Sequence, residues 1–183
     1  GDDLMESLSW RYLRSLCRRS DGVAAPSKTA IEELRQKVPD MPYSDWVSPG
    51  IDRGMFKTSI SGYDIRQRYG LEGKDVVLHV GRVSKEKNLE LIFNALPTVK
   101  KQKPNAKLMI VGSGPAKPYY MELVKKMGLE DDVIFTGFVP DEELPMHYAA
   151  CDTFVLASKF ETLGIVMTEA LAMGKPVAGI NFR

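Results

Sequence analysis

Two carboxylates, Glu161 and Glu169, are separated by seven residues in a stretch that could bind both an anion and hydroxyl groups. Glu161 falls in a loop after a short apolar run, and Glu169 falls in the helix expected next. The start of a helix exposes free amides and a partial positive charge, which suit a phosphate. A ligand that combines phosphate with polyol groups, such as a nucleotide-sugar, fits this pattern. A capping Glu and a solvated helix Glu fit it too, so the chemistry alone leaves both open.

The elements that must position these carboxylates are a strand, a helix and a second strand. Residues 153–156 are apolar and partly β-branched, which predicts a buried parallel strand. Gly174 is expected to adopt the left-handed conformation that ends a helix, and Pro176 prevents its continuation. Residues 177–180 then begin another buried strand. Apolar residues at helical spacing predict the buried stripe of the helix: Leu163, Val166, Met167 and Ala170.

A second candidate site is the basic loop at residues 81–88. Gly81 allows a close backbone turn, and Asn88 is expected to cap the following helix. Arg82 and Lys87 would lie beside the positive helix terminus, where a pyrophosphate is a natural occupant. If Glu86 instead paired with both cations, the loop would be a surface cluster of ion pairs without a ligand.

Two glycine-containing loops follow the next strands. Gly112 and Gly114 suggest a dinucleotide fingerprint, but the third glycine is missing and the loop follows the second strand, which argues against that assignment. Residues 137–140 follow the third strand. Phe138 in this turn is either a core side chain or part of a binding site, and the sequence does not separate the two.

The totals restrict the classes of function. With 25 basic and 24 acidic residues the net charge is +1, so no global field indicates a nucleic acid partner. Cys17 and Cys151 are too few for a disulfide framework or a metal site, and we expect structural roles for His79 and His147. The sequence shows neither a secretory signal nor an apolar run approaching the ~20 residues of a membrane span, so we expect a cytoplasmic protein.

From Asp75 onward, strands alternate with helices, which predicts an α/β fold with a Rossmann-like, doubly wound parallel sheet. Ligands of such sheets bind at the carboxyl ends of the strands, where the candidate loops fall. Before that region we expect a helix at 4–19, whose arginines form either a solvated or a membrane-facing surface. Shorter elements are expected at 23–25, 27–37, 46–47 and 63–69.

The stretch 158–176 resembles the signature of retaining glycosyltransferase family 4. The matching residues are Phe160-Glu161, Gly164, Glu169-Ala170 and Gly174-Lys175-Pro176-Val177, and Leu163 stands where the family often has Phe. The resemblance extends toward the N-terminus through Asp21-Gly22-Val23, Pro26-Ser27, Pro49-Gly50-Ile51-Asp52 and Phe56, with Pro49 where Asn is common.

This resemblance implies the C-terminal half of a GT-B glycosyltransferase. Residues 1–50 would be the tail of the N-terminal acceptor domain, 51–74 the interdomain linker, and 75–183 a truncated donor-binding domain. It implies transfer of a sugar from a nucleoside diphosphate-sugar to a sugar or lipid acceptor, with retained configuration and without metal or cofactor. The fragment alone would be inactive. Peripheral association with the inner membrane surface is a further expectation.

The resemblance also assigns roles. Arg82 and Lys87 would stabilise the leaving diphosphate and Glu161 would bind sugar hydroxyls, which makes these three the expected catalytic residues. Glu169 would bind the ribose, and backbone near Val139 the base. The full expected donor-binding set is Gly81, Arg82, Lys87, Gly112, Gly114, Phe138, Val139, Glu161, Thr162, Leu163, Gly164 and Glu169. Two alternatives remain: a sugar-nucleotide epimerase, which would need acid/base residues absent from these motifs, and a non-catalytic nucleotide-sugar binding module.

Overall fold

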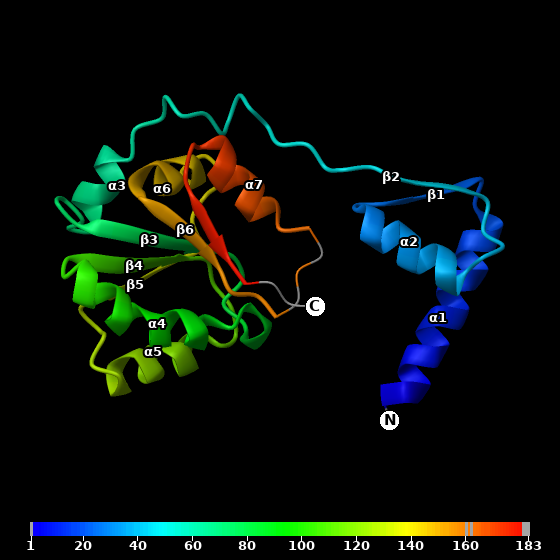
Figure 1. The fold of residues 1–183 in the computed structure, drawn as a ribbon, viewed down its shortest axis with the longest axis horizontal. Coiled ribbons are helices and arrows are strands. Elements are labelled where there is room, and N and C mark those ends of the chain that lie inside the picture. Colours follow the sequence, from blue (N-terminus) through cyan, green and yellow to red (C-terminus); the bar gives the residue numbers. More distant parts are fainter. Residues whose placement is uncertain (1, 160, 162, 181–183) are drawn as a thin grey trace. The chain divides into compact units, whose positions relative to one another are not determined.

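The computed structural model describes residues 2–159, 161 and 163–180 (Figure 1). Phe160 and Thr162, two of the residues singled out above, lie outside this part of the chain. The chain divides into two compact units, Gly1–Gly50 and Ile51–Arg183.

The first unit is a small parallel β-pair with two helices. Its elements are α1 (Asp2–Arg19), β1 (Gly22–Ala25), α2 (Lys28–Lys37) and β2 (Tyr43–Trp46), and β1 pairs with β2 in parallel. Ser27 is the N-cap of α2, as expected, because its hydroxyl accepts a hydrogen bond from the Ala30 N–H at 3.1 Å. The second strand begins earlier than predicted and ends before Val47.

The second unit is built on a five-stranded parallel sheet in the order β5-β4-β3-β6-β7. The predicted α/β, doubly wound fold is therefore confirmed. The chain proceeds from β3 outward to β5, returns to place β6 on the other side of β3, and so creates a switch in strand order between β3 and β6. The elements in order are α3 (Tyr63–Arg68), β3 (Asp75–Val80), η1 (Lys85–Lys87), α4 (Leu89–Gln102), β4 (Ala106–Val111), α5 (Lys117–Lys126), β5 (Val133–Gly137), α6 (Leu144–Ala150), β6 (Thr153–Leu156), α7 (Ile165–Ala172) and β7 (Val177–Gly179).

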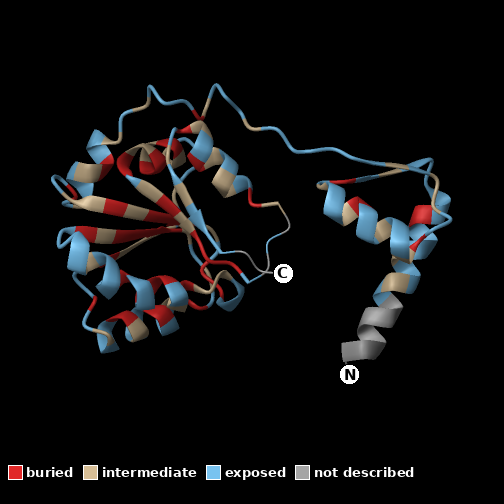
Figure 2. Cartoon of the chain, viewed as in Figure 1, coloured by how far each residue is buried: buried red, intermediate tan, exposed pale blue. Residues whose placement is uncertain are grey.

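Helices cover both faces of this sheet. Figure 1 shows α4 and α5 on one face and α3, α6 and α7 on the other. Alternation of side chains along the strands gives each face its own core, with Leu78 and Phe154 on the α6 side and Leu108 and Ile110 on the α4 side. The central strands β3 and β4 are correspondingly mostly buried, whereas β7 at the edge of the sheet is mostly exposed (Figure 2).

The segment before β3 packs into the second unit. Phe56, Ile65 and Leu71 are buried in the same cluster as the sheet residues. An added Cβ on Gly62 would lie 2.2 Å from the Ala150 N, so the start of α3 is in backbone contact with the end of α6. Whether residues 51–74 also connect two domains stays a prediction.

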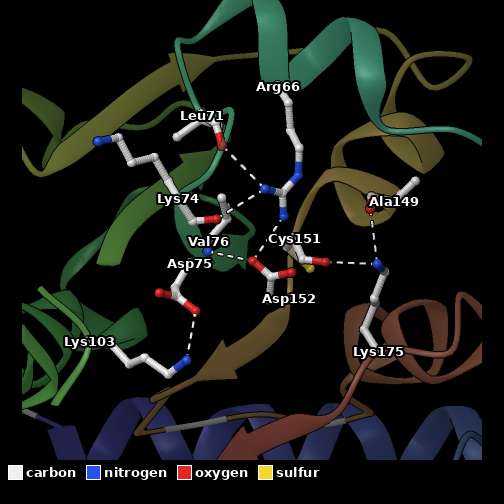
Figure 3. Close-up of polar contacts among 10 residues, drawn as sticks. All are labelled: Arg66, Leu71, Lys74, Asp75, Val76, Lys103, Ala149, Cys151, Asp152 and Lys175. Atoms are coloured by element: carbon white, nitrogen blue, oxygen red, sulfur yellow. Dashed lines mark hydrogen bonds and ion pairs between the residues drawn. The ribbon is translucent and has the colours of Figure 1, made fainter. Parts of the chain in front are cut away.

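A network of polar contacts fixes the end of this unit opposite the candidate site (Figure 3). Arg66 donates to the carbonyls of Leu71 and Lys74 at 3.2 and 3.0 Å and to the Asp152 carboxylate at 2.9 Å. The same carboxylate accepts from the Val76 N–H at 2.7 Å. Because Asp152 immediately precedes β6, these contacts join α3, β3 and β6.

Lys175, which follows the glycine at the end of α7, binds backbone carbonyls at the end of α6. Its ammonium group donates to the carbonyls of Ala149 and Cys151 at 2.9 and 2.7 Å (Figure 3). The last carbonyls of a helix lack partners within the helix, so Lys175 satisfies those at the end of α6. Gly174 has φ 71°, the left-handed conformation expected for it.

The predicted apolar stripe of α7 needs one correction. Leu163 lies before the helix, because Gly164 at the N-cap has φ 63°, a left-handed conformation that separates Leu163 from the helical turn. Ala170 is buried, whereas Val166 and Met167 are only partly buried against the core.

Candidate functional site

The loops that follow β3, β4 and β5 are joined by backbone hydrogen bonds at the carboxyl edge of the sheet. The Gly81 N–H donates to the Val111 carbonyl at 3.0 Å, and the Gly112 N–H donates to the Gly137 carbonyl at 2.8 Å. Farther along the loops, the Val83 N–H donates to the Ser113 carbonyl at 3.0 Å. The three predicted glycine loops are therefore adjacent in space.

Two of the predicted glycines are required by this close approach. Gly112 has φ 133°, and a Cβ there would lie 2.0 Å from the Gly81 carbonyl oxygen. A Cβ on Gly114 would lie 2.3 Å from the Val83 carbonyl oxygen. Both distances are far below any van der Waals contact, so the β3 and β4 loops pack backbone against backbone.

These loops enclose a hollow of about 260 Å³. The residues that line it include five of the predicted site residues: Gly81, Arg82, Gly112, Phe138 and Val139. Ser113, Asp141 and Leu144 are among the others. Phe138 is 78% exposed, so the alternative that it is a core side chain is wrong.

Lys87 and Glu161 form an ion pair beside this hollow's basic loop. Lys87 Nζ lies 2.9 Å from Glu161 Oε2, and Glu161 Oε1 accepts a hydrogen bond from the Gly164 N–H at 3.3 Å. Both side chains are mostly covered, with 21% and 29% of their surfaces exposed. The structure thus brings together three predicted site residues, Lys87, Glu161 and Gly164, from two loops that are far apart in the sequence.

The alternative in which Glu86 neutralises the basic loop is not what the structure shows. The Glu86 carboxylate accepts a hydrogen bond from the Ser84 hydroxyl at 2.5 Å, and its carbonyl accepts from the Lys159 N–H at 2.8 Å. Among the described residues, its carboxylate makes no ion pair with Arg82 or Lys87.

The Lys87 ammonium also affects ionisation of Glu161. Burial raises the pKa of Glu161, but the hydrogen bond and charge of Lys87, together with the Gly164 N–H, outweigh it and hold that pKa below its ordinary value. Glu161 is therefore an anion at neutral pH, able to accept hydrogen bonds from hydroxyl groups.

Arg82 is the exposed cation of the site. Arg82 lines the 260 Å³ hollow and also a second hollow of about 530 Å³, which Ser84, Lys85 and Tyr119 line as well. Within the described part of the chain its guanidinium makes no hydrogen bond, so all five of its donors are available to an anion.

The prediction that the Asn88 side chain caps α4 is wrong. Asn88 occupies the N-cap position with φ 53°, between η1 and α4, and its side chain makes no capping hydrogen bond. Asparagine tolerates the left-handed conformation better than most residues, so its function at this junction is to allow the chain to turn.

Glu169 is held by a residue that the sequence analysis missed. The Tyr148 hydroxyl in α6 donates to Glu169 Oε2 at 2.6 Å. Burial raises the pKa of Glu169, the Tyr148 hydrogen bond partly opposes this, and the charge of Asp141 adds to the increase. In the sequence, Tyr148 looks like any core tyrosine of a short helix, so no signal distinguished it.

His79 lies at the end of β3, beneath the same loops. Its Nδ1 is 3.2 Å from the Val155 carbonyl, and the ring is buried. Burial is the main reason that its pKa is lowered to about 4, with the charge of Lys87 contributing. The imidazole is thus neutral at physiological pH.

Neither a metal cluster nor a membrane-spanning helix is present in the described part of the chain. Its residues form no group of three or more His, Cys, Asp or Glu side chains able to hold a metal ion. None of its helices combines the length and the apolar character needed to span a bilayer.

The chain is similar to known proteins both in sequence and in structure. Residues 63–183 match the family model described as "Glycosyl transferases group 1". Mannosylfructose-phosphate synthase of Agrobacterium fabrum is 37% identical over 140 residues, which cover 71% of this chain and 31% of that protein. The sulfoquinovosyl transferase SQD2 of Arabidopsis thaliana is 33% identical over 181 residues, covering 92% of this chain and 32% of that protein.

A similar solved structure is that of Anabaena HepE in complex with UDP and glucose. It has a TM-score of 0.83 and 27% identity, and the match covers 100% of this chain and 50% of that chain. The chain therefore spans about a third of the length of these curated relatives and half of that solved chain. The predicted family is confirmed, and this chain belongs to the group 1 glycosyl transferases.

Proposed function

We propose that this chain is the donor-binding part of a retaining glycosyltransferase that moves a sugar from a nucleoside diphosphate-sugar to a sugar or lipid acceptor. The observation that carries the proposal is the Lys87–Glu161 pair beside the basic loop, at the switch in strand order. The similar Anabaena protein was solved in complex with UDP and glucose, which supports a nucleotide-sugar as the ligand here.

The roles follow from charge and position. Arg82 and Lys87 supply two cations that stabilise negative charge on the departing diphosphate, so the proposed reaction uses neither metal nor cofactor. Glu161 accepts hydrogen bonds from sugar hydroxyls, and the ammonium group of Lys87 holds its carboxylate in place beforehand. Glu169 accepts from the ribose, and backbone around Val139 contacts the base.

The remaining parts of the reaction lie elsewhere in the proposed enzyme. The acceptor would be bound by a domain of which residues 1–50 are only the tail, so the chain alone binds donor but does not transfer sugar. We place the enzyme in the cytoplasm, with peripheral association at the inner membrane surface when the acceptor is a lipid. The two curated relatives described above are a synthase and a transferase by name, which favours transfer over epimerisation.

The test is a calorimetric titration of the chain with UDP-, GDP- and ADP-sugars, followed by incubation of a longer protein with a radiolabelled donor. The expected result is binding of at least one donor by the chain and sugar transfer only by the longer protein. Failure of every donor to bind, or epimerisation of the sugar without transfer, would contradict the proposal.

A further inference from the structure

We infer that Tyr148 is a positioning residue that holds the Glu169 carboxylate so that its free oxygen accepts a hydrogen bond from the ribose of the donor. This inference rests on the proposed function, because it needs a nucleotide in the hollow beside β3 and β4.

The ring of Tyr148 is fixed from several sides. Tyr148 is 0% exposed. Its ring packs against Phe56 at a centroid distance of 5.9 Å and against Phe154 at 5.8 Å. Phe154 belongs to the sheet and Phe56 to the packed segment before α3, so the hydroxyl projects toward α7 from a rigid base.

The hydroxyl makes two contacts with α7. Its oxygen is 2.6 Å from Glu169 Oε2 and 3.2 Å from the Val166 carbonyl oxygen. A hydroxyl has one proton, and the shorter contact to an ionised carboxylate is the stronger. The Val166 carbonyl is one turn earlier on the same helix, so Tyr148 fixes both the helix and the side chain that it presents.

The direction of this hydrogen bond is determined by ionisation. Burial is the main reason that the pKa of Tyr148 lies well above its ordinary value, and the neighbouring Glu169 raises it further. The phenol therefore keeps its proton at neutral pH and donates it to the carboxylate.

The other carboxylate oxygen is the one that a ribose could use. Among the described residues none donates a hydrogen bond to Glu169 Oε1, and the side chain is only partly buried. Asp141, which lines the 260 Å³ hollow, is close enough for its charge to raise the pKa of Glu169. Glu169 itself does not line the hollow, and hydroxyls of a bound ribose are suitable donors for its free oxygen.

Tyr148 matters because an unsupported glutamate would have to be ordered when the nucleotide binds. Fixing a long side chain costs conformational entropy, and a residue that fixes it in advance removes this cost from binding. Loss of the tyrosine hydroxyl should therefore weaken binding of ribose-containing ligands specifically.

The experiment compares nucleoside diphosphates with and without ribose hydroxyls. UDP, GDP and ADP, and the 2′,3′-dideoxy form of each, are titrated by calorimetry into wild type, Tyr148→Phe and Glu169→Ala. Tyr148→Phe keeps the ring and its packing, so it should bind the ribonucleotide about five- to tenfold more weakly and the dideoxy form as well as wild type. Glu169→Ala should likewise weaken binding of the ribonucleotide and leave binding of the dideoxy form unchanged. The double variant should bind the ribonucleotide no more weakly than Glu169→Ala does.

Tyr120→Phe is the matched control. Tyr120 is 1% exposed and packs in the core on the α4 face of the sheet, so it loses a buried hydroxyl far from Glu169. It should leave the ratio of the two affinities unchanged. Glu169→Gln, which keeps the volume and one acceptor oxygen, provides a second variant should Tyr148→Phe unfold, and it should lose part of the preference for ribose.

The outcomes separate the inference from the proposed function. If Tyr148→Phe weakens binding of the ribonucleotide and of the dideoxy form equally, the positioning role is wrong and the nucleotide site stands. The same conclusion follows if Tyr148→Phe weakens binding of neither form while Glu169→Ala loses the preference for ribose. The positioning role is also wrong if wild type binds both forms alike. If wild type binds none of the three ribonucleotides, the proposed function fails and the inference fails with it.

Discussion

Lys87 and Glu161 are 74 positions apart in the sequence, yet Nζ of one lies 2.9 Å from Oε2 of the other. The pair joins the loop after β3 to the loop after β6, on either side of the switch in strand order. A cation and an anion that are proposed to bind different parts of one donor are thus coupled before any donor arrives.

Substitution of these two residues should affect different ligands. Glu161→Ala is expected to weaken a nucleotide-sugar more than the free nucleoside diphosphate, because it removes contacts to the sugar alone. Lys87→Ala should weaken both, since both contain the diphosphate. Each lost hydrogen bond with a charged partner should cost roughly 1.5–3 kcal/mol of binding free energy. Calorimetric titration of both ligands into each variant measures these losses. Equal losses for both ligands in both variants would refute the assignment, and in the double variant the effects should not add.

Arg82→Ala should lower affinity for a nucleoside diphosphate without changing thermal stability, because the exposed guanidinium makes no hydrogen bond with described residues. Added salt should weaken wild-type binding, and a nucleoside without phosphates should bind both proteins alike. Lys85→Ala is the control: it removes the same charge from the same loop, but this ammonium group lies 6.0 Å from the Tyr119 ring centroid. If the two variants behave identically, Arg82 has no particular role.

Gly114→Ala should destabilise the second unit and weaken nucleotide binding at the proposed site. The added Cβ would lie 2.3 Å from the Val83 carbonyl oxygen, so one loop must move. Overpacking of this kind costs about 1–3 kcal/mol in the free energy of unfolding. Gly50→Ala, whose Cβ would meet nothing within 4 Å, is the control in urea denaturation and in calorimetry. Unchanged stability and affinity in Gly114→Ala would mean that the contact does not constrain the loops.

His79 should make the second unit less stable in mild acid. Its pKa is lowered from 6.5 to about 4 in the folded state, so the unfolded chain takes up a proton first as the pH falls. The stability is fully present above pH 6.5 and is lost between pH 6.5 and 4, by up to about 3 kcal/mol at 1.36 kcal/mol per pH unit.

Urea denaturation at pH 7.5 and pH 5 measures this effect. His79→Gln keeps a side-chain N–H donor for the Val155 carbonyl but does not titrate. The stability that this variant loses between the two pH values should therefore be smaller than the loss in wild type. An equal loss in both proteins would show that other groups cause the acid sensitivity.

The sequence predicts well what depends on neighbouring residues. The strand at 153–156 has both of its predicted ends, since its apolar run is bounded by polar or small residues. Gly174 adopts its left-handed conformation for the same local reason. The family motifs also located the loops that lie together at the carboxyl edge of the sheet.

The contacts between distant residues could not be predicted in this way. Arg66 and Asp152 are 86 positions apart, and Tyr148 and Glu169 are 21 apart, so each contact depends on which strands and helices become neighbours. Local patterns also misled in two places. Leu163 matches the helical spacing but lies before Gly164, and Asn88 stands where a capping side chain is common but adopts a left-handed conformation instead.

The contact between Gly112 and the Gly81 carbonyl has a practical consequence for protein engineering. Of the residues that line the hollow, Ser113 and Val139 have side chains whose exchange leaves the backbone contact in place. A mutant library intended to change which nucleotide binds at the proposed site should therefore vary those two positions and keep Gly112, because any side chain there would push apart the two loops that form the walls of the hollow.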